Sequence, residues 1–381
     1  MKFFHLSDLH LGKRVNGFSM IEDQKFILNQ ILTAVREYNP EGILIAGDIY
    51  DKPVPSTEAV QLLDCFLKQL ADFGTEVFLI SGNHDSAERI AFGAALMEKS
   101  GIYVSPVYYG NILSIQKKDE YGEVNVYLFP FIKPAHVRKR AVGLEINSYE
   151  EAFRFVLQSL SIDSSKRNIA LVHQFITGAN QSDSEESFLG GLEQIQAELF
   201  QDFDYVALGH IHRSQNMGKN IRYCGSPLKY SFSEANDEKS ITLLTLTEKG
   251  NVHIEQIPLH PRCDMREIRG AYKKLTTREA YEGTEVSDYL HVTLTDEEDI
   301  PDALGKLRTI YPNIMKLDYD NRRTKEYAGE EKTVDLSKSP KAYVEELYEI
   351  QNNQKLNEIQ CAYINQLIQD IWDNAEGEQM E

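Results

Sequence analysis

Five short apolar runs in the first 212 residues each lead into side chains that can bind metal ions. The runs are residues 3–6, 43–46, 77–80, 169–172 and 205–208. Apolar runs of this length that alternate with helical patterns predict strands of an α/β fold. Ligands collect beyond the carboxyl ends of such strands. We therefore expect the polar groups that follow the five runs to form one site.

Seven potential metal ligands follow these runs, in the order Asp8, His10, Asp48, Asn83, His173, His210 and His212. Seven ligands are too many for one ion and suit a two-metal centre, in which ions about 3.5–4 Å apart act on one phosphate. The mixture of carboxylate, imidazole and amide favours manganese, iron or zinc over calcium or magnesium. No Cys belongs to the series, which argues against a structural zinc site.

Each of these residues also has an ordinary structural explanation when it is taken alone. A single His is more often a surface or core residue, and the stretch 82–85 has the composition of a turn. The recurrence of such groups at five strand ends, in this order, favours the metal centre over a purely structural role.

The same residues resemble the motifs of the calcineurin-like metallophosphoesterases, which are D-x-H, G-D-x-x-D, G-N-H-D/E, a lone His and G-H-x-H. The motifs lie at residues 8–10, 47–51, 82–85, 173 and 209–212. Within this family the chain is most similar to the SbcD group, the nuclease subunits of bacterial SbcCD complexes. The closer similarity extends over residues 5–12, 204–213, 225–227 and 231–234.

The resemblance implies a role for each candidate site residue. One ion would be bound by Asp8, His10 and His212, the other by Asn83, His173 and His210, and Asp48 would bridge them. His84 would act on the phosphate without binding metal, and Asp85 would fix the orientation of the His84 ring. Two divalent metal ions, expected to be manganese, are the implied cofactors.

The resemblance also implies an activity and partners. The expected enzyme is a metal-dependent DNA exonuclease and endonuclease that cuts at ends and hairpins in DNA repair and recombination. The expected partners are DNA, an SbcC-type coiled-coil ATPase bound through the C-terminal helices, and a second copy in a homodimer. The alternative is a phosphoesterase acting on a nucleotide or a phosphoprotein. A non-enzymatic scaffold is disfavoured because all seven ligands and His84 are present.

The net charge of −19 is unusual for a DNA enzyme, because binding phosphates usually requires a basic surface. Part of the excess lies in residues 344–381, which hold nine acidic residues and one Lys. Lys13 and Arg14 follow the first motif closely and are candidates for nucleic-acid binding, although a solvated surface is the usual role of such a pair. Archaeal and eukaryotic relatives have a His at the position of Asp51, so the DNA-positioning role of that His is not transferred.

The cysteine pattern and the hydropathy predict a cytoplasmic protein. The four cysteines are scattered, as is usual for reduced thiols, and no apolar run approaches the roughly 18 residues of a membrane span. The chain enters its first predicted strand almost at once, which leaves no room for a signal peptide.

The first 260 residues are expected to form the nuclease domain, with four layers, αββα, implied by the family. Helical spacing predicts helices over 20–38 and 56–73, the second with Ser56 as its N-cap. Strands are expected near 112–115 and 124–129. Residues 221–224, 241–246 and 252–257 are expected to form a β meander that closes one sheet.

A smaller α/β unit is expected over residues 264–321, with a strand at 289–295, a helix at 300–311 and a strand at 314–319. The family implies that it caps the DNA cleft, and a plain appendage is the alternative. Residues 322–339 are expected to be a linker. Residues 340–381 are expected to bind the partner, since 340–373 is predicted to be helical with a broad apolar face. That face could instead fold back on the capping unit.

Overall fold

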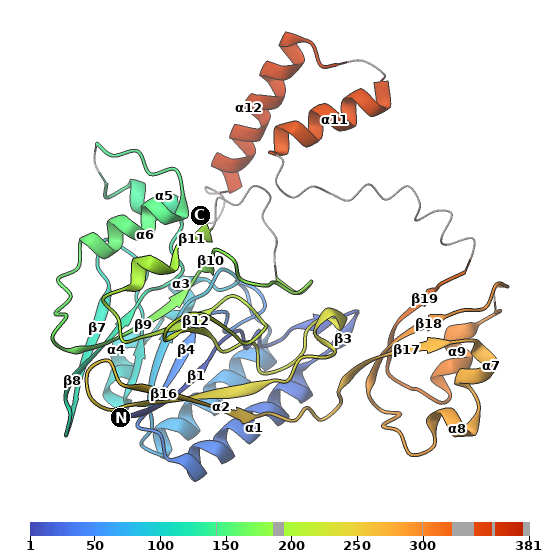
Figure 1. Ribbon diagram of the computed structural model, residues 1–381, viewed down its shortest axis with the longest axis horizontal. Helices are drawn as coiled ribbons and strands as arrows, with labels where there is room; N and C mark the ends of the chain where they lie inside the picture. The colour runs from blue at the N-terminus through green and yellow to red at the C-terminus, as the bar shows by residue number, and fades with distance from the viewer. Residues whose placement is uncertain (142, 186–193, 299, 322–338, 353–354, 376–381) are drawn as a thin grey trace.

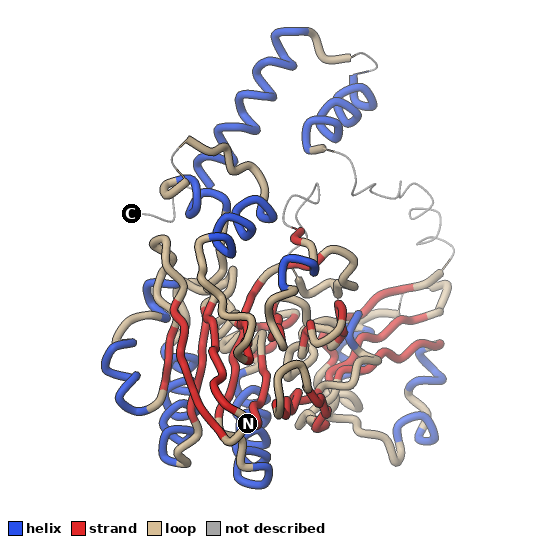
Figure 2. Tube along the Cα trace, turned by 60° about the vertical axis from the view of Figure 1, so that its left-hand side comes forward, coloured by secondary structure: helices blue, strands red, loops and turns tan. Residues whose placement is uncertain are grey.

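Two six-stranded sheets face each other in the first 258 residues and carry helices on their outer sides (Figures 1 and 2). The computed structural model describes residues 1–141, 143–185, 194–298, 300–321, 339–352 and 355–375. One apolar core lies between the sheets and one lies under the helices on each side. The expected α/β class and the four-layer αββα arrangement are confirmed.

The first sheet has the strand order β16–β15–β1–β4–β5–β6. Its strands are β1 (Lys2–Leu6), β4 (Gly42–Ala46), β5 (Glu76–Ile80), β6 (Ile102–Val104), β15 (Ser240–Leu246) and β16 (Val252–Pro258). β1, β4, β5 and β6 are parallel, whereas β15 pairs antiparallel with β1 and with β16. Every residue of β4 is buried, as expected for a strand covered on both faces.

The second sheet has the strand order β13–β14–β12–β9–β8–β7. Its strands are β7 (Leu113–Asp119), β8 (Gly122–Leu128), β9 (Arg167–His173), β12 (Tyr205–Gly209), β13 (Gln215–Gly218) and β14 (Ile221–Tyr223). β8, β9, β12 and β14 are parallel, and the edge strands β7 and β13 are antiparallel to their neighbours.

The predicted meander of 221–224, 241–246 and 252–257 is wrong. β14 pairs with β12 in the second sheet, whereas β15 and β16 form the edge of the first sheet. The segment between β14 and β15 therefore crosses from one sheet to the other. Alternating apolar residues predict a strand but do not specify which sheet edge the strand pairs with.

Helices cover both outer faces of the sandwich. α1 (Ile21–Tyr38) and α2 (Thr57–Asp72) contribute to the core on the first sheet, and α5 (Pro134–Arg138) and α6 (Tyr149–Gln158) to the core on the second. Ser56 caps α2 as predicted, because its side chain accepts a hydrogen bond from the Ala59 amide. The short elements are α3 (Ala87–Ile90), α4 (Ala94–Met97), η1 (Glu98–Ser100), η2 (Ala197–Phe200), η3 (Phe232–Glu234), and the strand pairs β2 (Arg14–Val15) with β3 (Phe18–Ser19) and β10 (Phe175–Ile176) with β11 (Gln194–Ile195).

The small unit that follows contains a parallel three-stranded sheet of β17 (Met265–Gly270), β18 (Tyr289–Leu294) and β19 (Ile314–Tyr319). It also contains α7 (Tyr272–Leu275), α8 (Arg278–Tyr281) and α9 (Ala303–Arg308). The predicted strand–helix–strand succession is present as β18, α9 and β19. The sheet gains β17, and α9 is shorter than predicted.

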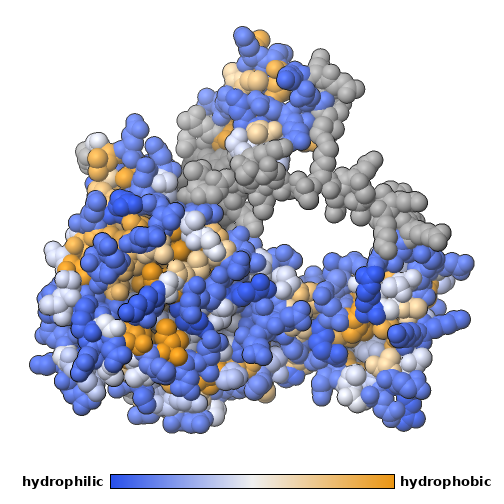
Figure 3. All heavy atoms as spheres, viewed as in Figure 1, coloured by the Kyte–Doolittle hydropathy of each residue, from blue (hydrophilic) through white to orange (hydrophobic). Residues whose placement is uncertain are grey.

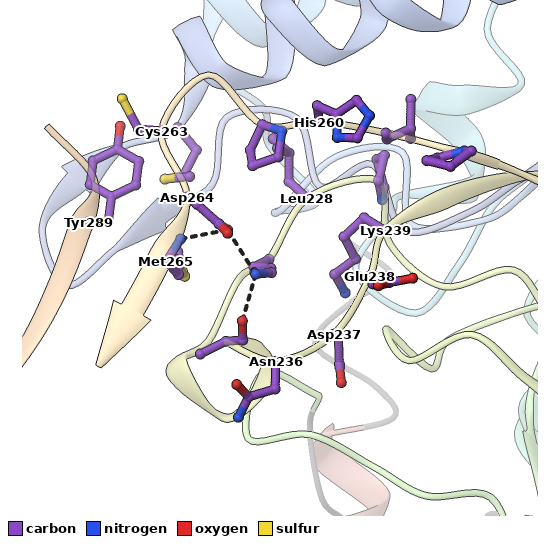
Figure 4. A pocket seen from close by; sticks show the side chains of 17 residues that line it. Leu228, Asn236, Asp237, Glu238, Lys239, His260, Cys263, Asp264, Met265 and Tyr289 are labelled. Atoms are coloured by element: carbon purple, nitrogen blue, oxygen red, sulfur yellow. Dashed lines mark hydrogen bonds and ion pairs between the residues drawn. The ribbon is translucent and has the colours of Figure 1, made fainter. Parts of the chain in front are cut away.

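The small unit is fixed to the sandwich by polar contacts around a cavity of about 410 Å³ (Figure 4). The Tyr289 hydroxyl donates to Asp23 on α1 at 2.7 Å, and Lys229 forms an ion pair with Asp264 at 2.8 Å. Because both contacts are partly or fully buried, we expect them to restrict the orientation of the unit relative to the sandwich.

The C-terminal helical prediction holds, but as two helices, α11 (Pro340–Asn352) and α12 (Glu358–Ala375). Asn357 begins the second helix, because its side chain accepts from the Gln360 amide at 2.9 Å. The two helices lie beside each other outside the sandwich (Figure 1). The predicted linker lies outside the described residues except for residue 339, as do residues 353–354 and 376–381 of the predicted partner-binding segment. None of the described helices is long and apolar enough to cross a membrane.

Candidate metal centre

The loops after five parallel strands meet at one end of the facing sheets. β1, β4 and β5 of the first sheet are followed by Asp8, His10, Asp48, Asn83 and His84, whereas β9 and β12 of the second lead to His173, His210 and His212. Among the described residues, three overlapping groups have donor atoms within 4.8 Å of one another. They are Asp8 with His10 and His212, Asp8 with Asp48 and His173, and His10 with Asp48 and His84.

Glycines allow close approach at this end, both between neighbouring loops and between the two sheets. A Cβ atom on Gly82 would lie 2.1 Å from a carboxylate oxygen of Asp48. A Cβ atom on Gly209 would lie 1.8 Å from the Ala46 carbonyl oxygen of the other sheet. No side chain fits at such distances, so only glycine permits this spacing of the candidate ligands.

Four candidate ligands have left-handed backbone conformations, which are uncommon for residues other than glycine. Their φ angles are 53° at Asp8, 43° at His10, 51° at Asp48 and 101° at His210. Such conformations cost about 1–3 kcal/mol each and cluster at functional sites. The backbone therefore directs these side chains inward at the expense of stability.

The first ligand group is set by two imidazoles that face each other. The Nε2 atoms of His10 and His212 are 3.0 Å apart, and both rings are buried. Two nitrogens bound at about 2.1 Å to one ion, at roughly a right angle, would be separated by about this distance. The arrangement fits two neighbouring positions around one cation.

The second ligand group surrounds the amide of Asn83. Its Oδ1 lies 2.9 Å from Nε2 of His173 and 3.0 Å from Nδ1 of His210. Nδ1 of His173 lies 2.8 Å from the Ala46 carbonyl and donates to it, so the neutral ring would present its lone pair on Nε2. These three atoms form a second set of donors that fits a cation.

Asp48 lies between the two groups. Its Oδ2 is 3.6 Å from Nε2 of His10 and 3.4 Å from Nε2 of His173. Its Oδ1 accepts a hydrogen bond from the His84 backbone amide at 2.9 Å, which fixes the rotation of the carboxylate. The position matches that of a carboxylate shared by two ions.

The pKa shifts at the centre also indicate that positive charge is favoured next to Asp48. Burial disfavours the ionised form, but His173 and His10 hold the pKa of Asp48 well below its usual value. Burial opposes protonation of His173, yet Asp48 raises the pKa of this ring to about 9. Burial lowers the pKa of His210 to about 3. A protonated His173 thus balances the carboxylates, and cations would take over that role.

The expectation that Asp85 orients the His84 ring is wrong. The Asp85 carboxylate accepts from the backbone amides of Gly82 at 2.9 Å, Ile49 at 3.0 Å and Tyr50 at 2.9 Å. Nδ1 of His84 instead lies 3.2 Å from the backbone carbonyl of Asp51. Asp85 therefore joins the loop after β4 to the loop after β5, and Asp51 positions the imidazole through its main chain.

We expect Asp85→Ala to lower the free energy of unfolding by at least ~2 kcal/mol, because three amide donors would lose their acceptor. Chemical denaturation measures the loss, and Asp85→Asn, which keeps one acceptor oxygen, should lie between this variant and the wild type. If Asp85→Ala is as stable as the wild type but has the kinetic defect of a His84 variant, Asp85 does orient the His84 ring.

The two basic candidates differ in their surroundings. Lys13 forms an ion pair with Asp51 at 2.8 Å, and its ammonium group lies 5.6 Å from the Tyr230 ring centroid. The Asp51 carboxylate also lies 3.8 Å from Nδ1 of His10. Arg14 is exposed and donates to the Gly17 carbonyl. Lys13 therefore lies at the rim of the centre, where Asp51 offsets part of its charge.

A buried polar group behind His212 was not predicted from the sequence. It contains Ser184, Glu185, Glu234 and Lys239, which reach His212 through hydrogen bonds. The only signal was that Glu234 lies in one of the stretches similar to the SbcD group. Nothing in its local pattern indicates burial, because an isolated Glu is normally exposed.

Comparison with known proteins agrees with this geometry. Residues 1–214 match the family model for calcineurin-like phosphoesterases. The SbcD component of nuclease SbcCD from Staphylococcus epidermidis is 32% identical over 381 residues, which cover 98% of this chain and 99% of that protein. The chain belongs to the SbcD group of calcineurin-like phosphoesterases. In this SbcD-group chain, residues 261–352 match a second model, the type 5 capsule protein repressor C-terminal domain. The family and the clustered His and Asp residues together indicate a dimetal site.

Solved structures with lower similarity are also known. A Thermus thermophilus protein, TT1561, is 13% identical with a TM-score of 0.39 and covers 67% of this chain and 98% of its own. A dimetal phosphatase from Danio rerio is 12% identical with a TM-score of 0.37 and covers 68% of this chain and 99% of its own.

Proposed function

We propose that this SbcD-group chain is the nuclease subunit of an SbcCD-type complex and hydrolyses DNA phosphodiester bonds with two manganese ions. The observation that carries the proposal is the pair of donor groups that share Asp48, within a chain that matches an SbcCD component over nearly its whole length. The donors combine imidazole, carboxylate and amide, a set that suits manganese.

Each ion would be held by one donor group. Asp8, His10 and His212 form one set, Asn83, His173 and His210 form the other, and Asp48 is common to both. Two bound divalent ions would neutralise charge on the phosphate and lower the pKa of water. The left-handed backbone at Asp8, His10, Asp48 and His210 would keep these donors in place between turnovers.

His84 is the side chain that we assign to the reacting phosphate. Its Nδ1 hydrogen is donated to the Asp51 carbonyl, so Nε2 is directed to the centre, 4.0 Å from Oδ2 of Asp48. When protonated, Nε2 can donate to a phosphate oxygen or protonate the leaving oxygen. The ring is partly exposed, as a group that meets a substrate must be.

We assign residues 1–260 to the nuclease domain and residues 264–321 to a capping domain. The contacts of Tyr289 with Asp23 and of Lys229 with Asp264 support the second assignment, since they hold the small unit against α1 and the segment that leads to η3. Lys13 and Arg14 are assigned to the DNA backbone, because Lys13 lies at the rim of the metal centre.

Residues 340–381 are assigned to binding the SbcC-type coiled-coil ATPase. Figure 3 shows apolar side chains among the polar ones over the α11–α12 hairpin. On α12, Ile359 is 81% exposed and Tyr363 is 67% exposed. An amphipathic helix that leaves such a face uncovered fits a groove or a coiled-coil surface of a partner.

We expect the double change Ile359→Asp and Tyr363→Asp to abolish copurification with the ATPase, since each added charge would be buried without a partner. Metal-dependent nuclease activity of the isolated chain should be unchanged. A pull-down with the ATPase and a nuclease assay without it measure the two effects.

Asn365→Asp is the matched control, because it adds charge to α12 close to Tyr363 in sequence but on another face of the helix. Deletion of residues 340–381 should reproduce the double change. If either variant melts markedly lower by circular dichroism while isolated, the helices pack on their own chain and the partner assignment fails.

A homodimer is proposed from a second exposed apolar surface. Phe92 and Leu96 are 85% and 74% exposed near α3 and α4, and Val54 is 68% exposed before α2. Arg89 of α3 donates to the Pro53 carbonyl at 3.1 Å, so the two segments are adjacent. Exposed large apolar side chains on adjacent segments fit a protein–protein interface.

The decisive experiment uses the purified chain with manganese and, in separate reactions, a DNA duplex, a DNA hairpin and a panel of small phosphodiesters. Each reaction is run with and without the SbcC-type ATPase and ATP. Cleavage of DNA that the ATPase and ATP stimulate supports the proposal. Hydrolysis of the small phosphodiesters without any cleavage of DNA would reject it.

A further inference from the structure

We infer that Glu234 is a positioning residue for His212, and that with Ser184 and Lys239 it fixes the tautomer and direction of that imidazole. The inference rests on the proposed role of His212 as a metal ligand. Glu234 is buried, and it has no role in the catalytic and capping assignments proposed above.

A relay of hydrogen bonds connects the Glu234 carboxylate with the His212 ring. The Ser184 hydroxyl donates to Oε1 of Glu234, and Oγ of Ser184 lies 2.7 Å from Nδ1 of His212. Because the hydroxyl hydrogen is directed to the carboxylate, Oγ accepts from Nδ1–H. The proton is then on Nδ1, so the Nε2 that faces His10 at 3.0 Å presents its lone pair.

Lys239 closes the network on the other side of the carboxylate. Its ammonium group lies 2.6 Å from Oε2 of Glu234, 2.8 Å from the His212 backbone carbonyl and 3.0 Å from Oγ of Ser226. Glu234 is fully buried, and Lys239 and His212 are 7% and 2% exposed. The ion pair therefore holds both the ring and the main chain of His212.

Glu185 holds the same residue by its amide. Its carboxylate accepts from the His212 backbone N–H at 2.6 Å and from the Ser182 amide. With Lys239 on the carbonyl and Glu185 on the amide, both backbone groups of His212 have buried charged partners. The ring is the part of His212 that Ser184 contacts directly, whereas Glu234 reaches the main chain only through Lys239.

Stability alone does not account for the buried ion pair. Removing two charges from water is costly, and well-packed apolar side chains of similar volume are often as stable or more stable. In other metal sites a carboxylate behind the ligating His sets the tautomer and raises ligand basicity. The relay through Ser184 gives Glu234 that position.

The network also reaches the junction with the capping domain. Lys239 lines the cavity between the sandwich and β17 (Figure 4). Phe232, in the same η3 turn as Glu234, packs on His291 of β18 with ring centroids 5.4 Å apart. The elements that position His212 are therefore the ones against which the small unit rests.

The test measures manganese binding by isothermal titration together with the metal content of the purified chain. Glu234→Gln keeps the shape of the side chain and removes its charge. We expect one of the two ions to bind roughly 10–100-fold more weakly, with the other unchanged. Ser184→Ala, which leaves the ion pair intact, should weaken the same ion, and it decides the matter if Glu234→Gln does not fold.

Asp119→Asn is the control for loss of a buried ion pair. Asp119 pairs with the buried Arg167 at the end of the second sheet remote from the ligands, so this variant should lose stability and keep both affinities. Wild-type affinity for both ions in Glu234→Gln and Ser184→Ala overturns the inference. Failure of the proposed function is distinguishable, because then the wild type binds no manganese or His212→Ala still binds two ions.

Discussion

Asp48→Asn should abolish DNA cleavage and weaken the binding of both manganese ions. Oδ2 of Asp48 lies 3.6 Å from Nε2 of His10 and 3.4 Å from Nε2 of His173, and Asp48 is the side chain proposed to bind both ions. An amide has no net charge and one oxygen. The rate should fall at least ~10³-fold, because several kcal/mol of charge stabilisation would be lost.

Metal content and titration with manganese test this expectation alongside the rate. Asn83→Ala is the informative contrast, since it should weaken mainly the ion assigned to His173 and His210. Asp202→Asn, an exposed change of the same chemistry, should leave rate and affinity unaltered. Two ions at full occupancy in Asp48→Asn would refute the bridging assignment.

His84→Ala should lower the catalytic rate roughly 10²- to 10⁴-fold, the usual range for loss of a general acid or base. Both ions should remain bound, because Nε2 of His84 is 4.0 Å from Asp48 and each donor group is complete without it. Single-turnover cleavage of a DNA hairpin measures the rate, and elemental analysis measures the ions.

The control is His253→Ala, which removes an exposed imidazole from β16, and it should change neither quantity. The geometry also places His84 within 4.8 Å of donors from His10 and Asp48, so it is close enough to be a ligand. A His84→Ala protein that retains one ion instead of two would move His84 into the metal-binding set.

Much of the fold was predictable because its signals are local. An apolar run followed by polar ligand-type side chains predicts a strand and its end together, and the ends of the five strands lie at one end of the two facing sheets. The partner of β14 was not predictable in this way. Its three residues pair with β12 and β13, and the following segment crosses to the first sheet, so the pairing depends on contacts distant in sequence.

The candidate ligands were predictable for the same reason, whereas the residues that hold them in place were not. Asp85 was assigned to the neighbouring imidazole, but its carboxylate meets amides 35 and 36 residues away. Glu234 reaches Ser184 across 50 residues. A motif specifies which side chains follow a strand, but it does not specify which distant donors compete for a carboxylate once the loops are packed.

Each proposed ion joins the two halves of the sandwich. His10 belongs to the first sheet and His212 to the second, 202 residues later, and Asn83 meets His173 across 90 residues. An ion bound by residues of both sheets would cross-link the sheets, whose facing surfaces are mostly apolar. A ligand at 100 times its dissociation constant adds about 2.7 kcal/mol to stability. The supply of the bound metal in the cell would therefore govern how much of this protein stays folded as well as how fast it acts.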